Sequence, residues 1–96
     1  MNLLPGSQRI TADGVVGVSG KPTRLYCVSL ISGASASVLS LLDGADATGN
    51  QLVSITGNAN TGVVINFAGG LRFPRGLYVD VDANISSATF VIDQEF

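Results

Sequence analysis

Turn signals recur every 6–12 residues along the whole chain, and this spacing is the strongest constraint on its fold. They are Asp13-Gly14, Gly20-Lys21-Pro22, Gly33, Asp43-Gly44, Gly49-Asn50, Gly57-Asn58, Gly69-Gly70, Pro74-Arg75-Gly76 and Asn84. The short segments between them are rich in Val, Ile, Leu, Thr and aromatic residues, which is typical of a β-sandwich or barrel. The sequence therefore predicts an all-β fold, a single antiparallel β-sandwich. We expect strands at 8–12, 15–19, 24–32, 37–42, 51–56, 62–68, 71–73, 77–82 and 87–93.

The length of 96 residues fits one domain with one core, and no compositional break divides it. We therefore expect residues 1–96 to form a single sandwich, with residues 1–7 as a flexible N-terminal arm.

Three segments alternate apolar and polar residues, as half-buried strands do, because successive side chains of a strand point to opposite faces. These are 62–68, 77–82 and 87–93. Their apolar faces predict a core that contains Val63, Ile65, Phe67, Leu77, Val79, Val81, Phe90 and Ile92.

Two other segments are apolar on both faces, which indicates strands covered on both sides. In 24–32, Leu25 and Ile31 lie opposite the face of Val28. In 37–42, Leu39 and Leu41 lie opposite the face of Val38. A two-layer sandwich covers one face only, so the sequence predicts that Leu25, Ile31, Leu39 and Leu41 contact another subunit.

Segment 34–42 has a second interpretation as a short helix. Ala34, Val38 and Leu41 fall at i, i+4 and i+7, which is a helical stripe. Its three serines are poor helix formers that favour turns and caps, so we favour the strand.

The composition is apolar for so small a domain. Hydrophobic residues make up 46% of the chain and charged residues only 12%, about half the usual share. A domain of this size has too much surface to hide all its apolar groups, so the excess is expected to face other subunits.

Charge and hydropathy also exclude several partners. The net charge is −2, and the basic residues are scattered in sequence at Arg9, Lys21, Arg24, Arg72 and Arg75. Nucleic-acid binding needs clustered cations, so no nucleic-acid partner is expected. No apolar run approaches the ~20 residues of a membrane helix. The N-terminal residues lack the basic and apolar regions of a signal peptide, so we expect synthesis in the cytoplasm.

No catalytic constellation emerges from the residues. The chain contains no histidine, which removes the usual general base near neutral pH, and a single cysteine, Cys27, which cannot form an intramolecular disulfide. Cys27 lies in an apolar segment and is expected to be a buried structural thiol. Residues 17–23 faintly resemble a phosphate-binding loop, but Pro22 stands where the motif needs Ser or Thr. We expect no enzyme activity, no catalytic residue, no cofactor and no small-molecule substrate.

Aspartates raise the question of a metal site, since hard cations take carboxylate oxygens. Asp80 and Asp82 share a strand face, and Asp43 and Asp46 share a loop. Neither pair has the spacing of a known calcium loop, so we interpret the first as a solvated face and Asp43 as a turn residue. No metal is expected.

The second half of the chain resembles a known family. The stretch GGLRFPRGLYVDV at 69–81, followed by ATFVI at 88–92, is similar to small β-sandwich virion proteins of tailed phages. RLYCVSL at 24–30 and VLSLLDG at 38–44 extend the resemblance over roughly residues 24–93. It implies a jelly-roll-like sandwich mounted on the phage head or tail, often as a trimer.

These observations predict a structural protein of a phage particle. The most specific form of this prediction is a capsid decoration or cement protein that binds itself, as a trimer, and a major capsid or other virion protein. Its location would then be the virion. The alternative is a receptor- or carbohydrate-binding sandwich of a tail or fibre, although the chain has no Trp and only two tyrosines, Tyr26 and Tyr78.

Overall fold

The computed structural model describes residues 3–95, and their backbone forms strands and connecting turns with no helix. The strands are β1 (Leu3–Ile10), β2 (Gly14–Val16), β3 (Thr23–Ser32), β4 (Ser37–Asp43), β5 (Asn50–Gly57), β6 (Gly62–Phe73), β7 (Leu77–Val81) and β8 (Ile85–Glu95). No helix in this part of the chain is therefore long or apolar enough to span a membrane.

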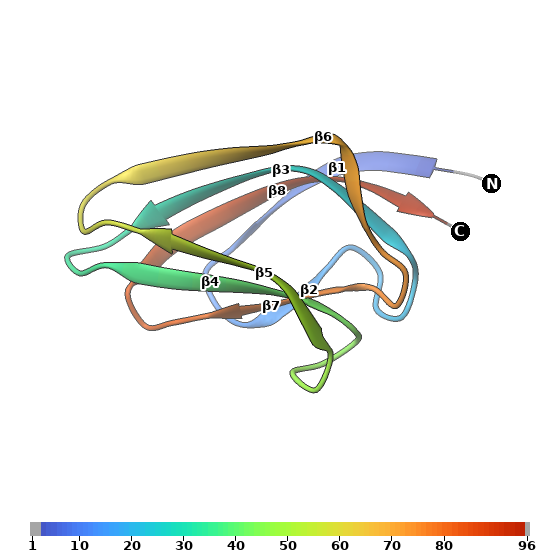
Figure 1. Ribbon diagram of the computed structural model, residues 1–96, viewed down its shortest axis with the longest axis horizontal. Helices are drawn as coiled ribbons and strands as arrows, with labels where there is room; N and C mark the ends of the chain where they lie inside the picture. The colour runs from blue at the N-terminus through green and yellow to red at the C-terminus, as the bar shows by residue number, and fades with distance from the viewer. Residues whose placement is uncertain (1–2, 96) are drawn as a thin grey trace.

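Two antiparallel four-stranded sheets pack face to face (Figure 1). Sheet A has the order β1-β8-β3-β6, and sheet B has the order β2-β7-β4-β5. Four of the ladders join β1 to β8, β2 to β7, β3 to β6 and β4 to β5, so the chain wraps as a doubled-over ribbon. Eight strands in two sheets with this wrapping define a jelly roll, and the predicted all-β sandwich is confirmed.

The core lies between the two sheets and is made by the inward faces of their strands. Its fully enclosed side chains include Val28, Leu30, Phe73 and Phe90. Of the predicted core residues, Leu77, Val79, Phe90 and Ile92 are buried, Ile65, Phe67 and Val81 pack partly buried against them, and Val63 is half-buried. The alternation in these three strands therefore assigned the inward face correctly.

The strand limits differ from the prediction in two places. Residues 3–7, expected to be a flexible arm, pair with β8 as the first part of β1; Met1 and Asn2 lie outside the described residues. The predicted strands 62–68 and 71–73 are one strand, β6, which bends where Gly69 and Gly70 adopt φ of 78° and 84°. Only glycine takes such angles readily, so the pair bends the strand without ending it (Figure 1).

Segment 34–42 is a strand at its C-terminal side, since Ser37–Asp43 pairs with both β5 and β7. The strand interpretation is confirmed and the short helix is wrong. Ladder hydrogen bonds on both sides satisfy the backbone of this segment, which an isolated short helix would leave partly unsatisfied.

Candidate assembly surface

The predicted subunit contacts prove to be mostly core residues. Leu25, Leu39 and Leu41 have no exposed surface, because they point between the two sheets of the same domain. Their side chains do not reach the surface, so the prediction that they contact a neighbour is wrong for the described structure. Ile31 is 47% exposed and remains a candidate.

A β-bulge explains the error in 24–32. The register of β3 against β8 pairs Leu25 with Ile92 and Cys27 with Val91, which leaves Tyr26 as an extra residue. An extra residue reverses the alternation beyond it, so Leu25 and Val28 both face inward. In β4 the inner face was simply assigned to the wrong residues: Val38 is 41% exposed on the outer side.

The outer face of sheet A has a neutral middle with exposed apolar side chains, bordered by Arg9 on β1 and by Arg24, Arg72 and Asp93 at one end. Val64 of β6 is 63% exposed, Val91 of β8 is 44% exposed, and Ile31 is 47% exposed on β3, the strand between β6 and β8. Cross-strand pairing puts small or neutral side chains around them on the same face, namely Cys27, Ser29, Asn66 and Thr89. Exposed aliphatic side chains among neutral neighbours are suited to contact with another protein.

The two long sides of the sandwich, where the sheets' edge strands face each other, are closed differently. On the side of β1 and β2, two glutamines join the sheets, and we call this the glutamine latch. Gln8 of β1 donates from Nε2 to the Val15 carbonyl (3.1 Å) and accepts at Oε1 from the Gly17 amide (3.0 Å).

Gln94 of β8, only 3% exposed, completes the latch. Its Oε1 accepts from the Val18 amide (2.7 Å) and the Thr23 hydroxyl (3.3 Å), and its Nε2 donates to the Pro22 carbonyl (2.7 Å). A Cβ on Gly17 would lie 2.2 Å from this Oε1, so glycine is required for the amide to enter.

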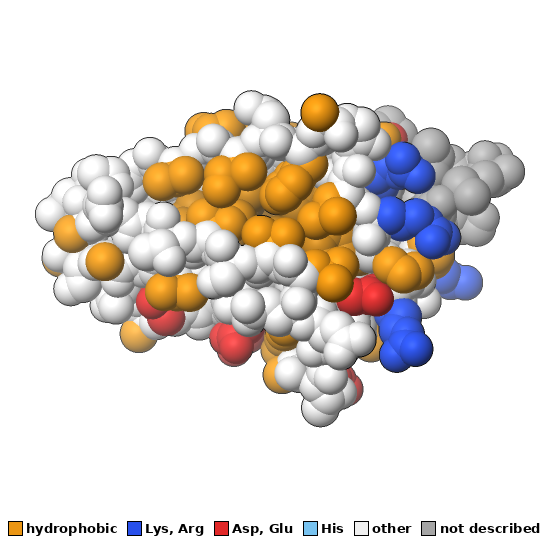
Figure 2. Space-filling model, in the orientation of Figure 1, with side chains coloured by type: hydrophobic (Ala, Val, Ile, Leu, Met, Phe, Trp, Pro, Cys, Tyr) orange, Lys and Arg blue, Asp and Glu red, His pale blue; other side chains and the backbone are white. Residues whose placement is uncertain are grey.

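On the opposite side, strands β5 and β6 form the edges of different sheets, and apolar side chains remain visible between them (Figure 2). We call this side the open seam. Its inward-facing residues Val53, Val63, Ile65 and Phe67 are only partly buried, in contrast to the enclosed centre of the core. Between residues 50–57 of β5 and residues 62–71 of β6, the structure shows no hydrogen bond like those of the glutamine latch.

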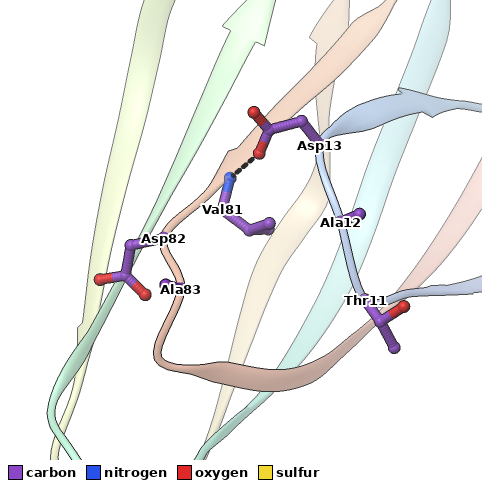
Figure 3. Close-up of a pocket in the computed structure, with 6 residues that line it drawn as sticks. All are labelled: Thr11, Ala12, Asp13, Val81, Asp82 and Ala83. Carbon is purple, nitrogen blue, oxygen red and sulfur yellow. Dashed lines mark hydrogen bonds between the residues drawn. The ribbon is translucent and has the colours of Figure 1, made fainter.

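A shallow pocket of about 500 Å³ lies at the end of β7, lined by Thr11, Ala12, Asp13, Val81, Asp82 and Ala83 (Figure 3). Its carboxylates are already engaged. Asp13 accepts from the Val81 amide at 2.7 Å (Figure 3), and Asp82 accepts from the amides of Val38 and Asn84 at 2.8 and 2.9 Å. These aspartates anchor the turns, as their short side chains commonly do.

The other pair of aspartates has the same role. Asp43 accepts from the Arg75 amide at 2.8 Å, and Asp46 accepts from both the amide and the hydroxyl of Thr48. The hydrogen bonds from Thr48 lower the pKa of Asp46, since they favour the charged carboxylate. Within residues 3–95, no group of three or more acidic or Cys side chains could hold a metal ion.

Basic residues that are far apart in sequence gather at one end of the sandwich (Figure 2). Arg24 pairs directly across from Arg72, and the turn that carries Arg75 touches the turn that carries Lys21. Acidic groups are interleaved with them, because Asp93 pairs with Arg24 on the other side of β3 and Asp43 accepts from Arg75. The fold therefore gathers the cations but does not leave them as an unbroken basic patch.

The cysteine and the two tyrosines discussed from the sequence lie on the outer faces of the sheets. Cys27, expected to be buried, is half-buried on sheet A, because the bulge at Tyr26 turns it outward. The Tyr26 hydroxyl donates a hydrogen bond to the Asp93 carboxylate, and this hydrogen bond raises the pKa of Tyr26.

Tyr78 belongs to sheet B, so the two tyrosines do not form one aromatic platform for a sugar ring. Residues 17–22 form the turn between β2 and β3, with no helix behind them to bind phosphate.

Comparison with known proteins supports the fold and goes no further. No family model matches the chain, and no curated protein matches it by sequence. A solved structure of a Bacillus endospore appendage, described as a family of disulfide-linked pili, is similar with a TM-score of 0.51 and 10% identity. That match covers 96% of this chain and 85% of the other. The Tobacco streak virus coat protein gives a TM-score of 0.48 at 10% identity, over 98% of this chain and 86% of that one.

Sequence reasoning missed the glutamine latch and the open seam. Gln8 and Gln94 belong to no sequence motif and lie 86 residues apart in the sequence. Only the pairing of β1 with β8 brings them to the same side of the sandwich. One signal for the seam was present in the sequence: the stretch from residue 47 to residue 71 contains no Asp, Glu, Lys or Arg.

Proposed function

We propose that this protein is a structural subunit of an assembled protein shell, with no catalytic role. The observation that carries the proposal is the neutral middle of the outer face of sheet A, on which Ile31, Val64 and Val91 are each about half exposed. Interface centres are depleted in charge, and the immediate neighbours of these three side chains are neutral.

The free energy gained by covering these three side chains is too small to hold an assembly together. Burying a large aliphatic side chain fully is worth about 1.5–3 kcal/mol, so covering the exposed halves of three contributes roughly 3 kcal/mol. Association costs about 4–15 kcal/mol, so the outer face of sheet A cannot hold a complex alone. A stable assembly needs further buried surface from the same subunit.

The finer proposal is a decoration or cement protein of a phage capsid, present in the virion as a trimer seated on a major capsid or other virion protein. The resemblance of residues 69–81 and 88–92 to phage virion proteins supports it. The pocket at the end of β7 agrees with a structural role, since it is shallow and its carboxylates are engaged in hydrogen bonds.

Self-assembly is tested by sedimentation velocity and multi-angle light scattering on the purified protein. We expect a defined oligomer at micromolar concentration, and Val91→Lys to weaken it, because a lysine on the outer face of sheet A would have to be desolvated. The control is Val38→Lys on the outer face of sheet B, where Val38 is exposed to a similar degree. A monomer at all concentrations contradicts the proposal.

The location is tested by antibody labelling of purified phage particles. Label over the head shell supports decoration, whereas label confined to the tail contradicts decoration and leaves a structural role elsewhere in the virion.

A further inference from the structure

We propose that the open seam between β5 and β6 is the site at which a second copy of this chain docks. This inference rests on the proposed self-assembly and names the surface that performs it. The first observation is the contrast between the two long sides of the sandwich. One side is sealed by the hydrogen bonds of Gln8 and Gln94, while the other leaves Val53, Ile65 and Phe67 partly uncovered between two sheet edges.

Both edges of the seam lack the charges and prolines that commonly prevent strand pairing, although each strand has one irregularity, at Leu52 in β5 and at residues 67–70 in β6. Edge strands usually carry charges, prolines or inward-pointing lysines, because their free backbone groups otherwise pair with another chain. β5 and the first ten residues of β6 lie within residues 47–71, which contain no charged residue and no proline. All 12 charged residues of the protein lie outside this stretch. The regular part of each strand, residues 53–57 of β5 and 62–66 of β6, is therefore free of charge and proline.

The size of this side of the molecule indicates a partner as large as the domain. Figure 2 looks down the shortest axis, so the seam lies on the broadest face, with extents of 42 and 26 Å. The whole face measures on the order of 1,000 Å² in outline, comparable with the roughly 800 Å² that each partner buries in an interface of standard size, and the seam forms its apolar middle. A single added strand is about 5 Å wide and would cover only part of it.

The charge distribution favours a second copy over a foreign protein. Complementary charges select one partner from others and speed its encounter, and residues 47–71, which form β5 and most of β6, carry none. A neutral surface meets no like-charge repulsion from its own copy, and the protomer's net charge of −2 adds little. A second copy of the chain therefore meets no charge repulsion at the seam, and it is present wherever the protein is.

The test places one lysine in the seam and one outside it. Val63→Lys puts a charge on an inward-facing, half-buried position of β6, from which its stem can still reach water. The matched control is Val38→Lys on the outer face of sheet B. We expect the wild type and Val38→Lys to form the same oligomer, and Val63→Lys to raise the dissociation constant about tenfold or more while circular dichroism stays native. A folded Val63→Lys protein with wild-type mass overturns the inference.

Hydrogen exchange on the wild type gives an independent measurement if Val63→Lys does not fold. We expect amides of β5 and of residues 62–68 to gain protection as concentration rises, whereas amides of β1 do not. Oligomers without this gain overturn the seam but keep the proposed function, in which case Val91→Lys on sheet A should dissociate them. A wild type that stays monomeric, with seam amides exchanging rapidly throughout, overturns both and indicates a strand from another protein as the occupant.

Discussion

Gln94→Ala should be among the most destabilising polar substitutions in this protein, although Gln94 is not part of any motif. The side chain is 3% exposed and holds the Val18 amide, the Thr23 hydroxyl and the Pro22 carbonyl with one amide group. Each hydrogen bond contributes about 1 kcal/mol net, so their loss should lower the free energy of unfolding by about 3 kcal/mol. For a domain of this size, that corresponds to a fall in Tm of roughly 12–24 °C.

Urea denaturation followed by circular dichroism measures this difference, with Gln51→Ala as the matched control. Gln51 is exposed on β5, so its truncation should change stability by less than about 0.5 kcal/mol. If Gln94→Ala and Gln51→Ala unfold at the same urea concentration, water or local rearrangement replaces the latch, and the account of how this side of the sandwich closes is wrong.

Three further predictions follow from single contacts. Gly57→Ala should destabilise the fold by about 1–3 kcal/mol, because the new Cβ would lie 2.6 Å from the Ser32 hydroxyl; a thermal melt equal to wild type would contradict this overpacking. Asp82→Ala should cost about 1–2 kcal/mol in chemical denaturation, since it frees two backbone amides, and an unchanged midpoint would show that water replaces the carboxylate. The raised pKa of Tyr26 stabilises the fold below pH 10, and this contribution is lost as pH rises through the folded-state pKa; Tyr26→Phe should remove the late step of tyrosinate absorbance, and a late step that persists would assign it elsewhere.

The sequence was sufficient where strands alternate without interruption. In 77–82 and 87–93 the period of two runs unbroken, so Leu77, Val79 and Phe90 were placed in the core correctly. It failed at Tyr26, because a bulge depends on how β3 pairs with strands some sixty residues away. No local sequence pattern predicts that pairing. One extra residue in β3 is enough to exchange which of its side chains face the core and which face outward.

The presence of exposed apolar residues was predictable from the sequence, but most of their positions were not. An excess of apolar residues over charge indicated contact with other subunits, and Ile31 is exposed as expected. The candidates Leu25, Leu39 and Leu41 were misplaced, because an apolar residue on a two-sided strand does not reveal which side faces the partner sheet. Exposure of Val64 and Val91 follows from cross-strand register, which is a property of the folded chain.

The doubled-over wrapping of the chain has a consequence for how it folds. β8 lies between β1 and β3 at the centre of sheet A, so the sheet cannot close until residues 85–95 have left the ribosome. Domains dominated by such distant pairings fold in milliseconds to seconds, far more slowly than helical bundles. During that interval the charge-free segment 47–71 has already been synthesised, and it can pair with β3 and β4 while the apolar faces of both sheets are still incomplete. A protein made in many copies would therefore be most prone to aggregate while still nascent, and slower translation before residue 85 should lower its soluble yield.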